Sequence, residues 1–371
     1  MSVNAATVSA GDALDTLAAG WAAQRDGGLT ASWMLHGRPG VGKTEVVRQL
    51  AQGIGARLFD LRLTTIEPQD LRGLPYYDHD RQTTVWYRPE DLPDDPDRPS
   101  VLFLDELTAA PPTLQPTVYG LLQERRVGRH RLPDACFVVA AGNSVEDGAV
   151  AYEMGTALAD RLIHLVVEAN PRDWLERYAP DRGLHPAVTA FIRGRPDLLD
   201  TTEAALGRGE TVACTPRSWE RVSDIVAAVP DRRLRAILVA GTVGTAAAAE
   251  FAVVADDVAA TVRVDEMLAT PRARRWPLYP ATLHGLTALI YGLVARTEGE
   301  TAAAAIEVMA DLRHLSRHRD EAALARLPLA ELCAFGFEMM IRKGLERGLE
   351  DVFAASDAYA AYAAERAAAG L

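Results

Sequence analysis

The stretch from Gly37 to Thr44 has the residue types and spacing of a phosphate-binding loop. It fits the pattern G-x-x-x-x-G-K-[ST] with the residues Gly37, Arg38, Pro39, Gly40, Val41, Gly42, Lys43 and Thr44. The glycines permit turns that aim backbone N–H groups at phosphate oxygens. Lys43 is expected to reach the β- and γ-phosphates, and the Thr44 hydroxyl to bind Mg²⁺. The loop therefore predicts a nucleotide site.

The use of lysine in this chain supports that prediction. Among 39 lysine and arginine residues, Lys43 and Lys343 are the only lysines. A compact ammonium fits between phosphates, where a planar guanidinium does not. A lysine kept at position 43 is therefore typical of a true phosphate-binding loop rather than a chance glycine-rich turn.

Hydrolysis of a nucleotide needs further groups, and polar residues follow two apolar runs. Asp105 and Glu106 come directly after Val101–Leu104. We expect Asp105 to serve Mg²⁺, directly or through water, and Glu106 to polarise the attacking water. Asn143 follows the run Cys136–Ala140. Its amide could hydrogen-bond both water and the γ-phosphate, although asparagine in a Gly-Asn-Ser stretch is often only a turn residue.

The elements that must position these residues alternate between strands and helices. Five short apolar stretches are predicted strands, at 32–36, 58–63, 101–104, 136–140 and 162–167. Such alternation indicates an α/β fold with a parallel sheet and helices on both faces. Hairpins are predicted at 76–87 and 125–133. After residue 170 the patterns are only helical, and one of the predicted helices spans 234–254.

Composition limits the class of protein. The 371 residues suffice for two or three domains, and the formal net charge of −12 argues against broad binding of nucleic acid or anionic membranes. The three cysteines have neither metal nor disulfide spacing, which favours a reducing compartment. No signal peptide or membrane span is recognised, so the expected location is cytoplasmic.

Taken together, these residues resemble the AAA+ ATPases and, within them, the MoxR-like group. The resemblance runs from about residue 10 to about residue 255. The hairpin at 76–87 resembles that clade's helix-2 insert, and the hairpin at 125–133 its pre-sensor-1 hairpin. The matching pieces, in the family's order, are Gly37–Thr44, Leu104–Glu106 followed by Ala110–Pro112, Leu121–Arg125, Gly142–Asn143, Ala159–Leu162 and Thr215–Glu220.

The resemblance implies roles that spacing alone does not indicate. Asn143 is similar to sensor 1, and Arg217 to sensor 2, which reaches the γ-phosphate from a helical lid. Arg161 is similar to the arginine finger, which enters the site of a neighbouring subunit. Either arginine could instead form a surface salt bridge. The chain departs from the family at Ser144, where proline is usual, and at Leu162, where phenylalanine is common.

The resemblance also implies an architecture and an activity. It predicts an AAA+ α/β domain with a five-stranded parallel sheet (1–169), an all-α lid (170–256) and a helical C-terminal extension (257–371). ATP and Mg²⁺ are the expected cofactors, and a hexameric ring the expected assembly. Hydrolysis would remodel a protein client, with a von Willebrand factor A-domain protein as the suggested partner. The client itself and the role of the extension are not indicated.

Other functions and features stay open at this stage. The main alternative is a nucleic-acid motor or McrB-like module; a switch with little turnover and a P-loop kinase fit less well. The arginines near 125–131 could contact nucleic acid or form salt bridges in a ring. Aromatic residues of the first hairpin could contact a client or pair across the strands. His314 and His318 lack a third metal ligand. Those aromatic residues are Tyr76, Tyr77, Trp86 and Tyr87.

Overall fold

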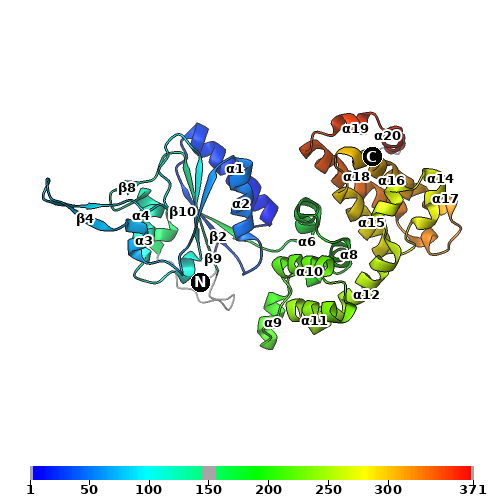
Figure 1. The fold of residues 1–371 in the computed structure, drawn as a ribbon, viewed down its shortest axis with the longest axis horizontal. Coiled ribbons are helices and arrows are strands. Elements are labelled where there is room, and N and C mark those ends of the chain that lie inside the picture. Colours follow the sequence, from blue (N-terminus) through cyan, green and yellow to red (C-terminus); the bar gives the residue numbers. More distant parts are fainter. Residues whose placement is uncertain (1–2, 144–155, 369–371) are drawn as a thin grey trace. The chain divides into compact units, whose positions relative to one another are not determined.

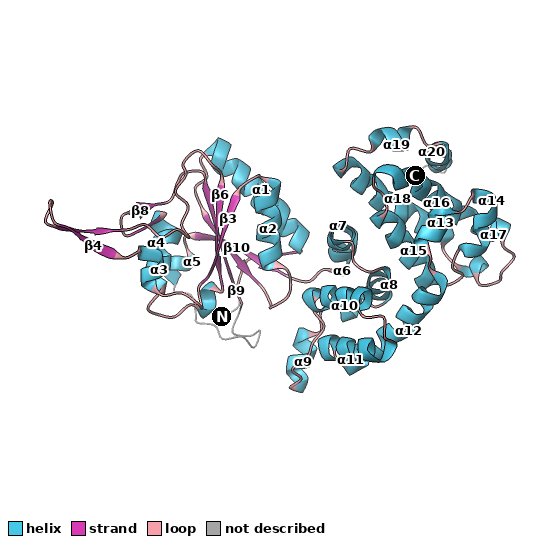
Figure 2. Ribbon diagram, in the orientation of Figure 1, coloured by secondary structure: helices cyan, strands magenta, loops and turns pink. Residues whose placement is uncertain are grey.

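The computed structural model describes residues 3–143 and 156–368 and divides near residue 170 into two compact units (Figure 1). The first unit, 1–170, is an α/β unit, and the second, 171–371, is helical. The change from strands to helices falls where the sequence predicts it, and Figure 2 shows the strands gathered in the first unit.

A parallel sheet forms the centre of the α/β unit. All five predicted strands are present, in the spatial order β10-β2-β9-β6-β3. A sixth strand, β1, extends the predicted five-stranded sheet by pairing with β10. It has only three residues, too few to produce a recognisable pattern in the sequence. The strands are β1 (Ala6–Val8), β2 (Ser32–His36), β3 (Arg57–Arg62), β6 (Ser100–Asp105), β9 (Cys136–Gly142) and β10 (Leu162–Val167).

Helices cover both faces of this sheet (Figure 1). Successive side chains of a strand point to opposite faces, so each strand contributes to two cores. Val101 and Phe103 of β6 face the core that α1 (Ala10–Gly27) and α2 (Lys43–Gly53) complete. Leu102 and Leu104 face the other core. That core includes residues of α3 (Pro68–Arg72), α4 (Gln115–Glu124) and α5 (Thr156–Ala159).

Both predicted hairpins are confirmed. The first consists of β4 (Pro75–Asp78) and β5 (Thr83–Trp86), and the second of β7 (Arg126–Val127) and β8 (His130–Arg131). In the first, the rings of Tyr76 and Tyr87 stack at 4.4 Å between centroids, which is the predicted pairing of aromatic residues across the hairpin.

The helical unit contains the rest of the chain. A single helix is predicted over 234–254, but the structure has two, α11 and α12. Gly244 separates them, because its φ of 85° and ψ of 157° cannot continue a right-handed helix. The helices are α6 (Pro171–Asp173), α7 (Ala179–Arg182), α8 (Pro186–Gly194), α9 (Thr202–Arg208), α10 (Pro216–Ala228), α11 (Arg232–Val243), α12 (Thr245–Thr261), α13 (Val264–Ala269), α14 (Arg272–Arg275), α15 (Leu283–Ala295), α16 (Ala302–Asp311), α17 (Leu315–His318), α18 (Leu329–Glu346), α19 (Glu350–Ala354) and α20 (Asp357–Ala368).

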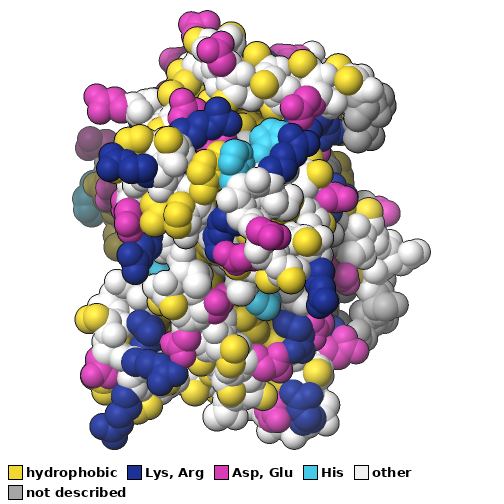
Figure 3. Space-filling view, turned by 90° about the vertical axis from the view of Figure 1, so that its right-hand side faces the viewer, with side chains coloured by type: hydrophobic (Ala, Val, Ile, Leu, Met, Phe, Trp, Pro, Cys, Tyr) yellow, Lys and Arg dark blue, Asp and Glu magenta, His cyan; other side chains and the backbone are white. Residues whose placement is uncertain are grey.

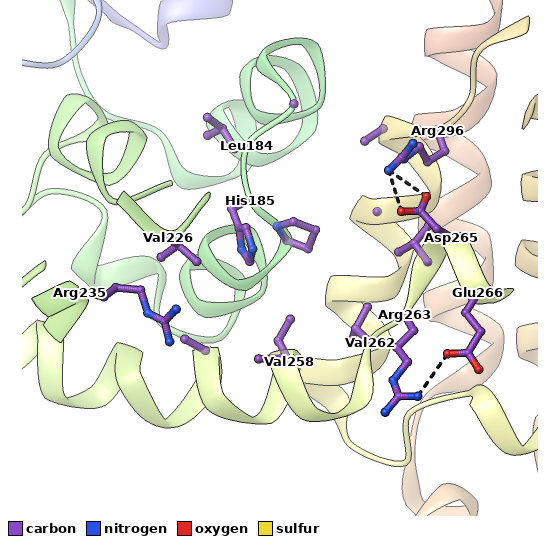
Figure 4. Close-up of a pocket in the computed structure, with 17 residues that line it drawn as sticks. Leu184, His185, Val226, Arg235, Val258, Val262, Arg263, Asp265, Glu266 and Arg296 are labelled. Atoms are coloured by element: carbon purple, nitrogen blue, oxygen red, sulfur yellow. Dashed lines mark hydrogen bonds and ion pairs between the residues drawn. The ribbon is translucent and has the colours of Figure 1, made fainter. Parts of the chain in front are cut away.

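The predicted boundary between lid and extension, at 256/257, falls inside α12. Helix α15, from the predicted extension, packs against α8 and α12 and is buried over 285–294. A cavity of about 610 Å³ lies along this seam (Figure 4). Val258 of α12 and Val262, just after that helix, line it, and the Arg296–Asp265 ion pair lies at one side. Residues 171–371 thus form one compact unit, and its functional division stays a prediction.

The charges on the surface bear on binding to nucleic acid, and the lengths of the helices bear on insertion into a membrane. On the face in Figure 3, acidic and basic side chains are interspersed. Among the described residues, no helix combines the length and apolar character that crossing a bilayer requires.

Candidate nucleotide-binding site

The predicted chemical residues meet at one edge of the sheet. Parallel strands have their carboxyl ends at the same edge, which is where ligands bind in open α/β sheets. The P-loop follows β2, Asp105 ends β6, and Asn143 follows β9. These three strands are neighbours in the sheet. The fold therefore brings together groups that lie up to about 100 residues apart in the chain.

The P-loop requires glycine at the positions where the sequence has it. Gly37, Gly40 and Gly42 have φ values of 151°, 87° and 107°, a region that residues with a side chain rarely adopt. A Cβ atom on Gly37 would also lie 2.4 Å from the carbonyl oxygen of Val167. Helix α2 begins at Lys43, so the positive end of its dipole faces the loop.

Lys43 is buried, with 8% of its surface exposed, and three oxygens hold its ammonium group. Nζ donates to the carbonyl oxygens of Gly37 and Arg38, at 2.5 and 3.0 Å. It also donates to Oδ1 of Asn143, at 2.9 Å. This last contact joins the P-loop to the end of β9, as expected if both serve the same phosphate.

Thr44 and Asp105 supply the oxygen ligands expected for Mg²⁺. Thr44 Oγ1 lies 3.4 Å from Asp105 Oδ2. Burial raises the pKa of the Asp105 carboxyl, whereas the hydrogen bond from the Glu106 backbone opposes that rise. A cation beside this carboxyl would stabilise its ionised form. A hydroxyl and a carboxylate are the donors that Mg²⁺ prefers, so these residues fit the metal.

Glu106 is held in an unusual backbone conformation. Its φ of 60° is left-handed, which costs energy for a residue other than glycine and often marks a functional site. Oε2 accepts a hydrogen bond of 2.5 Å from Thr64 Oγ1, and Oε1 lies 3.8 Å from Arg62 Nε. Sequence reasoning missed Thr64, although its place just after the predicted strand 58–63 was a usable signal.

Thr108 is a second residue that sequence reasoning missed. Its Oγ1 donates to the carbonyl oxygen of Asn143 at 2.9 Å and accepts from the Asn143 N–H at 3.1 Å. These two bonds fix the backbone of Asn143. A Cβ atom on the preceding Gly142 would lie 2.6 Å from Thr108 Oγ1, so glycine is needed there. Ser144, where the sequence departs from the usual proline of the family, lies outside the described residues.

The two predicted arginines are placed differently from this group. Arg161 is exposed and directly precedes β10, whose Leu162 pairs with Ser32 at the start of β2. The P-loop begins at the other end of β2. Along the strand direction, Arg161 therefore lies about six residues from the start of the P-loop, or roughly 20 Å at about 3.3 Å per residue. Arg217 lies exposed on α10 of the helical unit, and its part in the site stays a prediction.

The sequence matches a known domain family over the region just described. Residues 32–181 match the model of the AAA domain, dynein-related subfamily. None of the curated proteins matches the chain. Residues 32–181 are therefore an AAA domain, and the chain is an ATPase with the AAA+ fold.

Solved structures resemble the chain only distantly. A putative ATPase from Cytophaga hutchinsonii is 14% identical, with 89% of this chain and 83% of that one covered and a TM-score of 0.33. A RuvB mutant from Thermotoga maritima is 16% identical, with coverages of 82% and 89% and a TM-score of 0.39. An MCM homologue from Methanopyrus kandleri is 17% identical, with coverages of 65% and 53% and a TM-score of 0.31.

Proposed function

We propose that this ATPase is a MoxR-like ring protein, built as a hexamer, that shares each active site between two subunits and remodels a protein client. The observation that carries the shared site is the placement of Arg161. Arg161 is exposed. From the strand register and the rise per residue, it lies roughly 20 Å from the start of its own P-loop along the strand direction. An arginine there is suited to the γ-phosphate of a neighbour rather than to that of its own subunit.

Each residue at the sheet edge has a distinct task in this proposal. Lys43 neutralises the phosphates and releases its carbonyl partners to do so. Thr44 and Asp105 would hold Mg²⁺, which would supply charge neutralisation for the phosphates. Glu106, fixed by Thr64, orients and polarises the attacking water. Asn143 contacts the γ-phosphate. Arg217 of the helical unit contacts the same phosphate when nucleotide is bound.

The shared site is tested with complementary variants. Arg161→Ala should bind ATP but lose turnover, by about 10³–10⁵-fold where such fingers act. Glu106→Gln should also bind without turnover. Mixed rings contain interfaces with an intact Glu106 on one side and an intact Arg161 on the other, so activity should reappear. Light scattering with ATP reports assembly, and inactive rings that are shown to be mixed would contradict a finger acting in trans.

The client side of the proposal rests on the resemblance to the MoxR-like group and on one exposed surface. The β4–β5 hairpin exposes 77% of Tyr77 and 63% of Tyr87, and Leu74 beside it is 67% exposed. We expect a protein partner, of the von Willebrand factor A-domain kind, to be retained by a Glu106→Gln trap. Tyr77→Ala in that trap should lower the recovery of the same partner and leave ATP binding unchanged.

The observed ion pairs of the second hairpin give the nucleic-acid alternative no specific support. Arg126 Nε lies 2.7 Å from Glu124, and Arg131 lies 3.5 Å from Asp134. These arginines are thus partly neutralised by acidic neighbours. Stimulation of the ATPase by DNA that falls steeply with salt would revive that alternative.

A further inference from the structure

Two histidines connect the P-loop end of the sheet to the turn that carries Arg161. His36 is the last residue of β2 and directly precedes Gly37. His164 lies within β10, three residues after Arg161. His36 Nε2 is 2.8 Å from His164 Nδ1, and His164 Nε2 is 2.8 Å from the carbonyl oxygen of Ala159. The two rings stack at 5.1 Å between centroids.

The acceptor at the end of this chain assigns its protons. A carbonyl oxygen only accepts, so His164 Nε2 carries a hydrogen and donates it to Ala159. In a neutral His164 ring, Nδ1 is then an acceptor, and His36 Nε2–H must be its donor. Burial, His164 and Lys43 together lower the pKa of His36 to about 4, which keeps its ring neutral near pH 7.

The chain of hydrogen bonds runs along the strand direction, from His36 beside the P-loop toward the turn that carries Arg161. Val166 of β10 pairs with His36, so His164 lies two residues further toward the opposite edge, on the same face. Ala159 is the last residue of α5, and Asp160 and Arg161 follow it. The bonds therefore join the residue before Gly37 to the residue two positions before Arg161.

We propose that His36 and His164 are positioning residues, which link the state of one subunit's P-loop to the arginine finger that this subunit presents to its neighbour. The inference rests on the proposed role of Arg161 in trans. The carbonyl oxygens of Gly37 and Arg38 hold the Lys43 ammonium, and they lose this partner when the ammonium turns to phosphate. His36 precedes Gly37, so a shift of the loop is passed to His164 and Ala159.

Substitutions of His164 can break each bond separately. His164→Asn keeps an acceptor at the Nδ1 position for His36 and removes the bond to Ala159. His164→Gln keeps a donor toward Ala159 and removes the acceptor for His36. His164→Phe removes both and preserves the ring volume. His318→Asn, which removes an imidazole stacked on Trp276 in the helical unit, controls for the loss of a ring.

All three His164 variants should bind ATP with an affinity close to that of the wild type, because they leave the P-loop residues in place. Their kcat should fall about 10–100-fold, the effect of a misplaced catalytic group. The His318→Asn control should keep the wild-type kcat. Wild-type turnover in His164→Phe would overturn the inference, and circular dichroism with ATP calorimetry shows which variants are folded. Should His164→Phe fail to fold, His164→Asn and His164→Gln carry the test.

Mixed rings separate a role in trans from a structural role in the same subunit. A His164→Phe subunit has an intact Glu106 but a misplaced finger, and a Glu106→Gln subunit has the converse. If the histidines act through Arg161, the mixture should exceed the summed activity of the two variants. If they only support their own P-loop, no interface is complete and the mixture gains nothing, which overturns the inference.

The Arg161→Ala mixture with Glu106→Gln distinguishes the two possible failures. If ATPase activity reappears in that mixture but not in the mixture of His164→Phe with Glu106→Gln, this inference is wrong and the shared site stands. No recovery in either mixture, in rings shown to be mixed, removes the shared site itself. Ring-nitrogen NMR shifts add an independent check. His36 and His164 should both appear as the Nε2–H tautomer, and the opposite tautomer at either ring would contradict the proposed chain of bonds.

Discussion

The two lysines of the chain lie in similar surroundings, one in each unit, and do different work. Lys43 in the α/β unit is 8% exposed, and Lys343 in the helical unit is 6% exposed. Lys343 Nζ donates to the carbonyl oxygens of Val294 and Ala295, at 3.0 and 2.8 Å, and lies 3.5 Å from Glu298. Both ammonium groups are thus held by oxygens that a planar guanidinium would not fit as well.

The difference lies in what those oxygens belong to. Val294 and Ala295 end α15, and the last carbonyl groups of a helix have no partner within it. Lys343 therefore caps a buried helix end. The partners of Lys43 belong to a glycine-rich loop and to Asn143, at a strand edge where ligands bind. Similar contacts therefore suit Lys343 to stabilising its unit, whereas the proposed task of Lys43 is nucleotide binding.

The largest expected effect follows Lys43→Ala, which tests the first half of this comparison. ATP binding should be lost, because a charged partner of the phosphates contributes about 2–5 kcal/mol or more. The free energy of unfolding should change less than in Lys343→Met, because Gly37, Arg38 and Asn143 are partly exposed and water can replace the ammonium there. Calorimetry with ATP measures the first quantity and chemical denaturation the second. An ATP affinity within about threefold of the wild type would remove the P-loop assignment.

Glu106→Gln should separate chemistry from binding within the α/β unit. ATP should bind, whereas turnover should fall about 100-fold or more, because the amide cannot polarise the attacking water. Glu124→Gln, which changes an exposed glutamate of the same unit, is the matched control and should be active. Retained turnover in Glu106→Gln would mean that another residue holds the water.

Lys343→Met tests the second half of the comparison. We expect a loss of about 1–3 kcal/mol in the free energy of unfolding, because the Ala295 carbonyl loses its lysine partner, whereas the Val294 carbonyl still accepts from the Thr297 N–H at 3.1 Å. ATP affinity should be unchanged. Chemical denaturation and calorimetry measure the two quantities, and an unfolding free energy equal to that of the wild type would show that Lys343 is not a cap.

Exchange of each lysine for arginine sharpens the comparison. Lys343→Arg should cost about 1–3 kcal/mol of stability, because the larger planar group overfills a closed site. Lys43→Arg should instead weaken ATP binding. If both variants lost the same property, the proposed difference between the two sites would be wrong.

The smallest effect concerns pH and His36. The folded state lowers the pKa of His36 from its ordinary value of 6.5 to about 4. Between these values the unfolded chain binds a proton that the folded chain refuses, so stability falls as pH falls from 6.5 to 4. His36→Gln should flatten this slope. Denaturation midpoints of wild type and variant across that pH range provide the measurement, and parallel curves would contradict the lowered pKa.

The α/β unit was largely predictable because its information is local. Each strand is a short apolar run, and each chemical residue follows such a run directly, as Asp105 and Glu106 follow 101–104. Parallel strands then place those residues at one edge. Strand β1 was missed because three residues carry too little pattern, and Gly244 was not recognised as the point where one predicted helix becomes two.

Contacts between distant segments were not predictable. Thr64 and Thr108 hold Glu106 and Asn143, but a threonine has no pattern that names its partner. The His36–His164 bond depends on β10 pairing with β2, which places the two rings within reach across 128 positions of sequence. The packing of α15 on α8 likewise joins segments that the sequence assigned to separate domains.

By itself, the sequence determined the phosphate-binding loop, the strand-and-helix alternation and the order of the chemical residues, since these depend on neighbours in the chain. Only the tertiary structure decided that the other lysine, Lys343, caps the end of a helix. The tertiary structure alone also placed Arg161 at the edge of the sheet opposite the P-loop and brought His36 next to His164. The physical reason is the same in each case: hydrogen bonds and strand register act between atoms that are close in space, whatever their separation in sequence.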